Sequence, residues 1–118
     1  MKMRKMVVLT LVILSIFAFT VPAEANSISW NNGTFGWSLT TSGANVTART
    51  TFSRSIRLVT TVQIQNNATG AFIAQGTIDS TNTVAQIVRT GLAQGRAAFG
   101  AHEARGNTAI ARHTSIWR

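Results

Sequence analysis

Residues 55–65 read SIRLVTTVQIQ and carry the clearest structural signal in the chain. Side chains suited to a core occupy every second position: Ile56, Leu58, Thr60, Val62 and Ile64. The positions between them hold Arg57, Val59, Thr61, Gln63 and Gln65. Because successive side chains of a strand point to opposite faces, this period of two predicts a β-strand with one face buried.

Other parts of the chain alternate in the same way, at residues 46–52, 83–90, 96–104 and 108–117. Asn- and Gly-rich turn signals separate these runs at residues 31–33, 42–43, 66–70, 79–82, 91–95 and 106–107. We therefore predict seven or eight short strands in an all-β fold, a small antiparallel β-sandwich. The Ala-rich stretch 93–111 offers an alternative, a short helix, against which Gly95, Gly100 and Gly106 argue.

The N-terminus has the pattern of an export signal. Lys2, Arg4 and Lys5 precede an apolar run at residues 6–21, which ends at Pro22 and an Ala-Glu-Ala site at residues 23–25. The alternative is a membrane anchor, but a span needs about 20 apolar residues. We predict a signal peptide at residues 1–25, cleavage after Ala25, and a secreted single domain at residues 26–118 with no stable membrane span.

The predicted mature domain is small, basic and without cysteine. It carries eight arginines, no lysine and two acids, Asp79 and Glu103, which gives a net charge of +6. Small exported domains often rely on disulfides. Without cysteine this domain must rely on packing, on a partner or on self-association, and we therefore include a homo-oligomer among the expected states. The charge predicts attraction to anionic surfaces. Outside a cell these include lipid head groups, wall polymers and phosphate-bearing wall precursors, and we expect no nucleic-acid partner.

The arginines are the candidate binding residues, because a guanidinium binds phosphate or carboxylate with two parallel hydrogen bonds. The candidates for an anionic target are Arg49, Arg57, Arg89 and Arg112. Arg49 and Arg57 are expected on the polar faces of their strands, Arg112 with Ile110 and Ile116, and Arg89 with Ala85 and Ile87. They would form one cationic patch if Arg49, Arg57 and Arg112 share a face. The alternative is that they decorate a soluble surface.

Three tryptophans lie near the ends of the mature domain. Trp30, Trp37 and Trp117 are candidate aromatic contacts with a membrane interface or a sugar ring. The alternative is that the terminal strands share one layer of the core.

Few residues of the chain are suited to catalysis or to metal binding. The titratable groups suited to acid–base work are Asp79, Glu103, His102 and His113, and there is no cysteine nucleophile. His102 and Glu103 point to opposite faces of a strand. Glu103 and His113 lie on the two strands of a predicted hairpin, and we interpret them as a surface pair. We predict that the protein is not an enzyme, has no catalytic residues, and binds no metal and no cofactor.

Several segments of the mature chain together resemble the lactococcin 972 family of bacteriocins. The segments are Trp30-x-x-Gly33 with Gly36, residues 62–70 with the turn Asn66-Asn67-Ala68-Thr69-Gly70, residues 95–104, and residues 107–117. The resemblance implies an antiparallel β-sandwich and a secreted antibacterial protein that binds the lipid-linked wall precursor. This chain departs from the family in having no tyrosine and in carrying Thr and Arg where an early His-rich segment is expected.

Two functions follow as expectations. One is a bacteriocin-like protein that acts on the envelope or cell-wall synthesis of other bacteria. The other is a non-toxic secreted protein that coats an anionic wall polymer or polysaccharide.

Overall fold

The computed structural model describes residues 21–118, with side chains from residue 25 onward. Residues 1–20 of the predicted signal peptide lie outside this part of the chain. The strands are β1 (Val21–Trp30), β2 (Gly33–Ser42), β3 (Asn45–Asn66), β4 (Phe72–Thr90), β5 (Arg96–Arg105) and β6 (Ala109–Trp117). Among the described residues no helix is long and apolar enough to cross a membrane.

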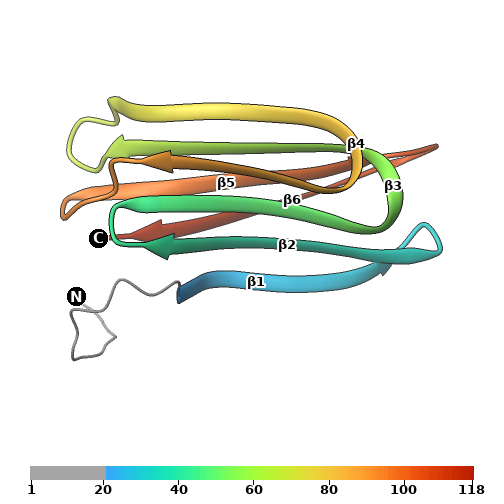
Figure 1. Ribbon diagram of the computed structural model, residues 1–118. Coiled ribbons are helices and arrows are strands. Elements are labelled where there is room, and N and C mark those ends of the chain that lie inside the picture. The colour runs from blue at the N-terminus through green and yellow to red at the C-terminus, as the bar shows by residue number, and fades with distance from the viewer. Residues whose placement is uncertain (1–20) are drawn as a thin grey trace.

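All six strands belong to one antiparallel sheet that is folded over into two layers (Figure 1). The β2 layer consists of β1, β2, residues 45–52 of β3 and residues 84–90 of β4. The β5 layer consists of residues 56–66 of β3, residues 72–82 of β4, β5 and β6. The predicted all-β antiparallel sandwich is confirmed, and the alternative helix at residues 93–111 is wrong, because most of that stretch lies in β5 and β6.

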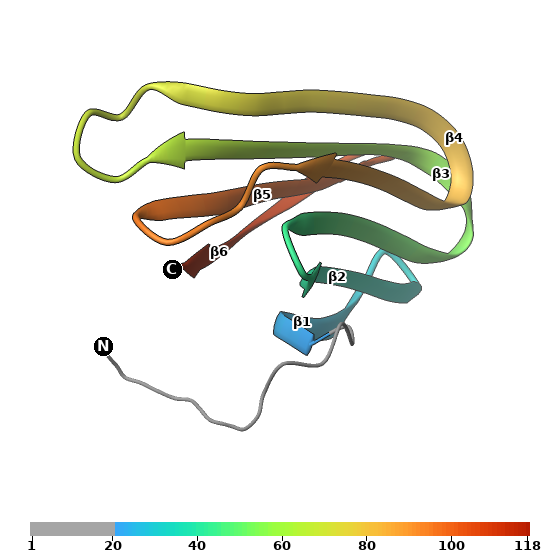
Figure 2. The same ribbon diagram turned by 60° about the vertical axis from the view of Figure 1, so that its left-hand side comes forward.

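Two strands pass through both layers, and Figure 2 shows β3 and β4 curving together from one layer into the other. The pairing of β3 with β4 shifts between Thr51↔Val84 and Ile56↔Asn82, so β3 has three residues more than β4 at this point. Extra residues in one strand of a pair bend it and increase its twist. The bend lets a single strand of 22 residues serve both sides of the core.

This bend corrects the predicted number of strands. The alternating runs at residues 46–52 and 55–65 are halves of β3, and the run at residues 83–90 is the end of β4. The predicted turn at residues 79–82 is wrong, since β4 continues through it and Asp79 pairs with Val59. The other predicted turn signals do separate strands, and at the first of them Asn31 and Asn32 adopt φ of 52° and 58°, which suits a tight hairpin.

The inner faces of the two layers form the core. One hydrophobic cluster contains Leu39, Val46, Val62 and Ile64, and a second contains Phe35, Phe52 and Leu58. Strand β5 adds mostly small residues, and Gly100 is one that packing requires. A Cβ at that position would collide with the hydroxyl of Thr114 and come within 2.9 Å of His102 Nε2.

A buried polar belt lies between the two hydrophobic clusters. His102 is 1% exposed, and its Nδ1 and Nε2 lie 3.1 Å from Thr50 Oγ1 and 2.8 Å from Thr114 Oγ1. Thr60 Oγ1 lies 2.7 Å from Thr50 Oγ1 and 3.0 Å from the carbonyl oxygen of Ala85. Thr50 and Ala85 belong to the β2 layer, so their hydrogen bonds with His102 and Thr60 connect the two layers. The hydrogen bond between His102 and Thr114 joins β5 to β6 within the β5 layer. Burial lowers the pKa of His102 to about 4, only partly offset by a hydrogen bond to the backbone of Arg49.

The depressed pKa of His102 makes the stability of the fold depend on pH. Between the folded value of about 4 and the ordinary value of 6.5, the unfolded chain binds a proton that the folded chain rejects. The free energy of unfolding therefore falls as the pH drops through this window. We expect His102 to account for a loss of about 2 kcal/mol between pH 7 and pH 5 in urea denaturation.

The matched control is His113, which is exposed on the same hairpin. The loss between pH 7 and pH 5 should persist in His113→Gln and be largely absent from His102→Gln. An unchanged pH dependence in His102→Gln would contradict this account, as would an NMR titration that places the His102 pKa near 6.5.

Candidate functional site

The four candidate arginines for an anionic target lie on separate surfaces. Arg49 is on the outer face of the β2 layer, where its Nη1 donates to Gln86 Oε1 at 3.3 Å. Arg57 is on the outer face of the β5 layer. Arg89 and Arg112 belong to the inner faces of their strands, which they share with Ile87 and Ile110, each two residues away. The predicted faces within each strand are confirmed, but the conditional patch of Arg49, Arg57 and Arg112 does not form.

The bend of β3 explains this separation. Arg49 lies before the bend and Arg57 lies after it, so their polar faces look outward from opposite sides of the sandwich. Periodicity assigns each arginine to the polar face of its own strand segment. It contains no information on which layer that segment joins.

Arg89 and Arg112 bind backbone carbonyls at the open edges of the sheet. Arg89 Nε donates to the carbonyl of Gln75 at 3.1 Å, and its Nη1 donates to the carbonyl of Val88 at 2.9 Å. Arg112 Nη1 donates to the carbonyl of Ala111 at 2.8 Å, and the guanidinium lies 5.4 Å from the ring centre of Trp37. Charged side chains on an edge strand hinder pairing with another chain, so these two arginines have a structural task.

The three tryptophans lie in two different environments. Trp30 packs edge-to-face against Phe35 and Phe52, and Trp37 packs against Phe35 beneath Arg112, so both belong to the margin of the core. Trp117 is 62% exposed on the outer face of the β5 layer, and its ring meets Phe99 edge-to-face at 5.5 Å. Of the three candidate aromatic contacts, Trp117 is the one that is open to a ligand.

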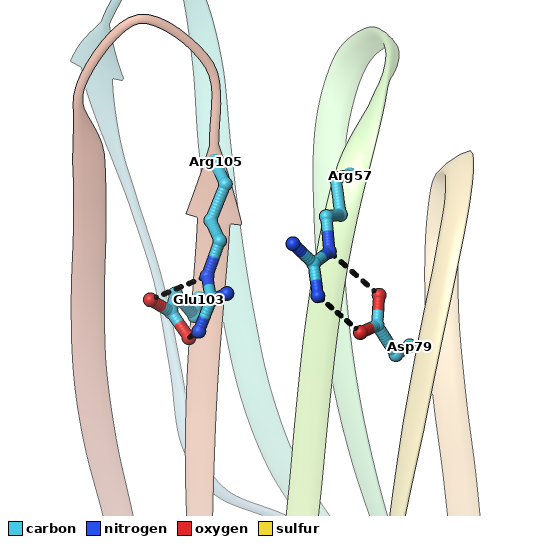
Figure 3. Close-up of polar contacts among 4 residues, drawn as sticks. All are labelled: Arg57, Asp79, Glu103 and Arg105. Atoms are coloured by element: carbon cyan, nitrogen blue, oxygen red, sulfur yellow. Dashed lines mark hydrogen bonds and ion pairs between the residues drawn. The ribbon is translucent and has the colours of Figure 1, made fainter.

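Two ion pairs stand side by side on the outer face of the β5 layer (Figure 3). Arg57 binds both carboxylate oxygens of Asp79, at 3.0 and 2.7 Å, and Arg105 binds both oxygens of Glu103, at 2.9 and 3.0 Å. Arg57 and Arg105 are directly paired across β3 and β5. The hydrogen bond from Arg57 lowers the pKa of Asp79, and the carboxylates raise the pKa of both arginines. Asp79 and the two arginines therefore remain charged at neutral pH.

A shallow depression of about 230 Å³ lies farther along the same face. Its lining comes from Thr61, Gln63, Phe99, Gly100, Ala101 and His113. Ala101 lies in one cross-strand row between Thr61 and His113, so a small side chain on β5 is flanked by larger ones on β3 and β6. This difference in side-chain size hollows the surface. The depression offers hydroxyl, amide and imidazole groups beside an aromatic ring.

The groups considered for catalysis or metal binding do not gather in one place. His102 is buried, Asp79 and Glu103 are held by arginines, and His113 lines the depression. Glu103 therefore pairs with Arg105 rather than with His113. Among residues 21–118 no three His, Asp or Glu side chains come close enough to hold a metal ion.

The sequence pattern did not identify Arg105, Gln63 or Phe99 as part of a site. Part of the necessary information is in the sequence, because residues 96–104 alternate as a strand does and Gly106-Asn107 marks the turn that follows. The sequence pattern does not reveal that Arg57 pairs with Arg105, because this pairing depends on the register between β3 and β5.

Comparison with known proteins finds no family model, no curated protein and no solved structure that matches this chain.

The different settings of the tryptophans can be measured by fluorescence. We expect acrylamide to quench the folded protein mainly through Trp117. Replacement of Trp117 by Phe should remove most of the quencher-accessible emission, whereas Trp37→Phe, the matched control, should retain it. Equal quenching of the wild-type protein and Trp117→Phe would contradict the exposed position of Trp117.

Proposed function

We propose that this chain is a secreted, cationic antibacterial protein of the bacteriocin type. In this proposal it acts on the envelope or the cell-wall synthesis of other bacteria by binding an anionic, phosphate-bearing target. The proposal draws on the export pattern at residues 1–25 and on the resemblance to the lactococcin 972 family over residues 30–117.

The observation that carries this proposal is the unbalanced charge of the domain. Within residues 25–118 both acids are used in ion pairs, Asp79 with Arg57 and Glu103 with Arg105. The other six arginines have no carboxylate partner in this part of the chain. They contact neutral oxygens instead, as Arg54 does with the carbonyls of Asn31 and Asn32 and Arg96 does with that of Gly91. Such a surface attracts polyanions over a distance that salt controls.

A second candidate function is a protein that coats a wall polymer without toxicity. The depression beside Phe99 and His113 favours it, because hydroxyl and amide groups next to an aromatic ring suit sugar or polyol units. Both candidates share export and an anionic envelope partner. They differ in whether binding harms the cell.

Export can be tested apart from toxicity. In a bacterium that expresses the full chain, we expect the culture medium to contain a protein whose first residue is Asn26. Such a protein would keep the part of β1 that pairs Asn26 with Trp37 and Trp30 with Gly33. N-terminal sequencing and intact mass provide the measurement. Retention of the whole polypeptide in the cytosol, with Met1 in place, would contradict export.

Toxicity can be tested with the protein purified from that culture. We expect clearing zones on lawns of Gram-positive bacteria, and binding to isolated cell walls that weakens between 0.05 and 0.5 M salt, as the Debye length shortens from about 14 to about 4 Å. Binding to walls without clearing on any strain would favour the coating function. Absence of both clearing and binding would overturn both candidates.

A further inference from the structure

The outer face of the β5 layer contains two guanidinium groups arranged as a pair. Arg57 and Arg105 occupy directly opposed positions on adjacent strands, where Cβ atoms lie about 5 Å apart. Each ion pair uses Nε and Nη2 of its arginine, so Nη1 takes no part in either. In Figure 3 the remaining nitrogen of each guanidinium points toward the other arginine.

This arrangement suits an anion with several oxygens. Two guanidinium groups that face one another can each donate to a different oxygen of one phosphate group. Asp79 and Glu103 balance the repulsion between the arginines and hold each guanidinium in a fixed orientation. A donor that is already oriented loses less entropy when its ligand binds.

The face continues from the arginine pair toward aromatic residues. The depression with Thr61, Gln63 and His113 lies next along β3 and β6, and Phe99 with Trp117 follows it. From Arg57 to Gln65 the strand extends over about 26 Å, at about 3.3 Å per residue. The surface therefore offers, in order, a phosphate-sized pair of donors, a polar hollow and a ring surface.

We propose that this face binds an extended polymer of phosphodiester-linked polyol or sugar units. One phosphodiester lies between Arg57 and Arg105, and the adjacent polyol or sugar unit lies in the hollow over Ala101. The inference rests on the proposed function in one respect, that the target is anionic envelope material, and it names the chemistry of that target and the face that binds it.

Two comparisons within the molecule favour this assignment. The outer face of the β2 layer places Arg49 between Ser38 and Gln86, without a second arginine in the same row. A lipid surface would match a broad apolar patch, whereas on this face the exposed ring of Trp117 stands next to the half-buried Phe99 and to the polar groups of the hollow. A phosphodiester-linked polymer with hydroxyl groups matches both the Nη1 donors outside the two ion pairs and the polar hollow.

The test is calorimetric titration of the protein, purified from a bacterium that expresses the full chain, with lipid-free poly(glycerol phosphate). Dextran of similar length and phosphatidylglycerol vesicles are the comparison probes. The variant Arg57→Lys/Arg105→Lys keeps the net charge but lacks the planar forks, and Arg49→Lys/Arg54→Lys is the matched control. A third variant, Ala101→Leu, fills the hollow from an outer-face position and changes no charge.

We expect the polymer to bind, Arg57→Lys/Arg105→Lys and Ala101→Leu each to weaken binding about ten-fold, and the control to change it less than two-fold. Dextran and vesicles should bind at least ten-fold more weakly than the polymer. Full affinity in Arg57→Lys/Arg105→Lys would overturn the inference, and so would stronger binding to vesicles or dextran than to the polymer.

The inference and the proposed function can fail separately. Growth inhibition without polymer binding would overturn the inference and leave the antibacterial function standing. Polymer binding without growth inhibition would support the inference and replace the antibacterial function with coating.

Discussion

The structure depends on the bend in β3. On one edge this strand pairs with β4 along both halves, and on its other edge it pairs first with β2 and then with β5. The three additional residues between Thr51 and Ile56 turn the strand from one layer into the other. A chain without cysteine has no covalent cross-link between its layers, and here a continuous backbone provides the connection. The core is small, as expected for about 90 residues, and both of its hydrophobic clusters take residues from β3.

The polar belt adds specificity to that core. Apolar packing in the cluster of Leu39 and Ile64 tolerates small shifts between the layers. The hydrogen bond between His102 and Thr50 forms in one relative position of the layers, and the bond between His102 and Thr114 fixes the ring within the β5 layer. A buried imidazole is costly when it is charged or unpartnered. Burial keeps the ring of His102 neutral, as its depressed pKa indicates. Its two nitrogens are hydrogen-bonded to threonine hydroxyls, which can act as donor or acceptor.

The fold class and most of the faces were accessible from the sequence because they depend on local periodicity. Ile56, Leu58, Val62 and Ile64 alternate with polar residues and are turned inward as the pattern indicates. The pattern failed where the outcome depends on contacts between distant segments. The signal at residues 79–82 looks like a turn, but pairing of Asp79 with Val59 keeps that segment in a strand. In the same way the pattern makes Arg57 a candidate but not its neighbour Arg105, since only the register of β3 against β5 brings the two together.

The same bend that makes the core also sorts the arginines. It directs Arg49 to one outer face and Arg57 to the other, while Arg89 and Arg112 remain at the sheet edges on backbone carbonyls. We propose that the outer face of the β5 layer, rather than that of the β2 layer, binds an anionic partner. Chemical-shift mapping by NMR during addition of poly(glycerol phosphate), with the arginine Nε–H signals included, tests this directly. We expect perturbations at Arg57, Arg105, Gln63 and Phe99 and none at Arg49. Perturbations centred on Arg49, or spread evenly over all the arginines, would contradict this proposal.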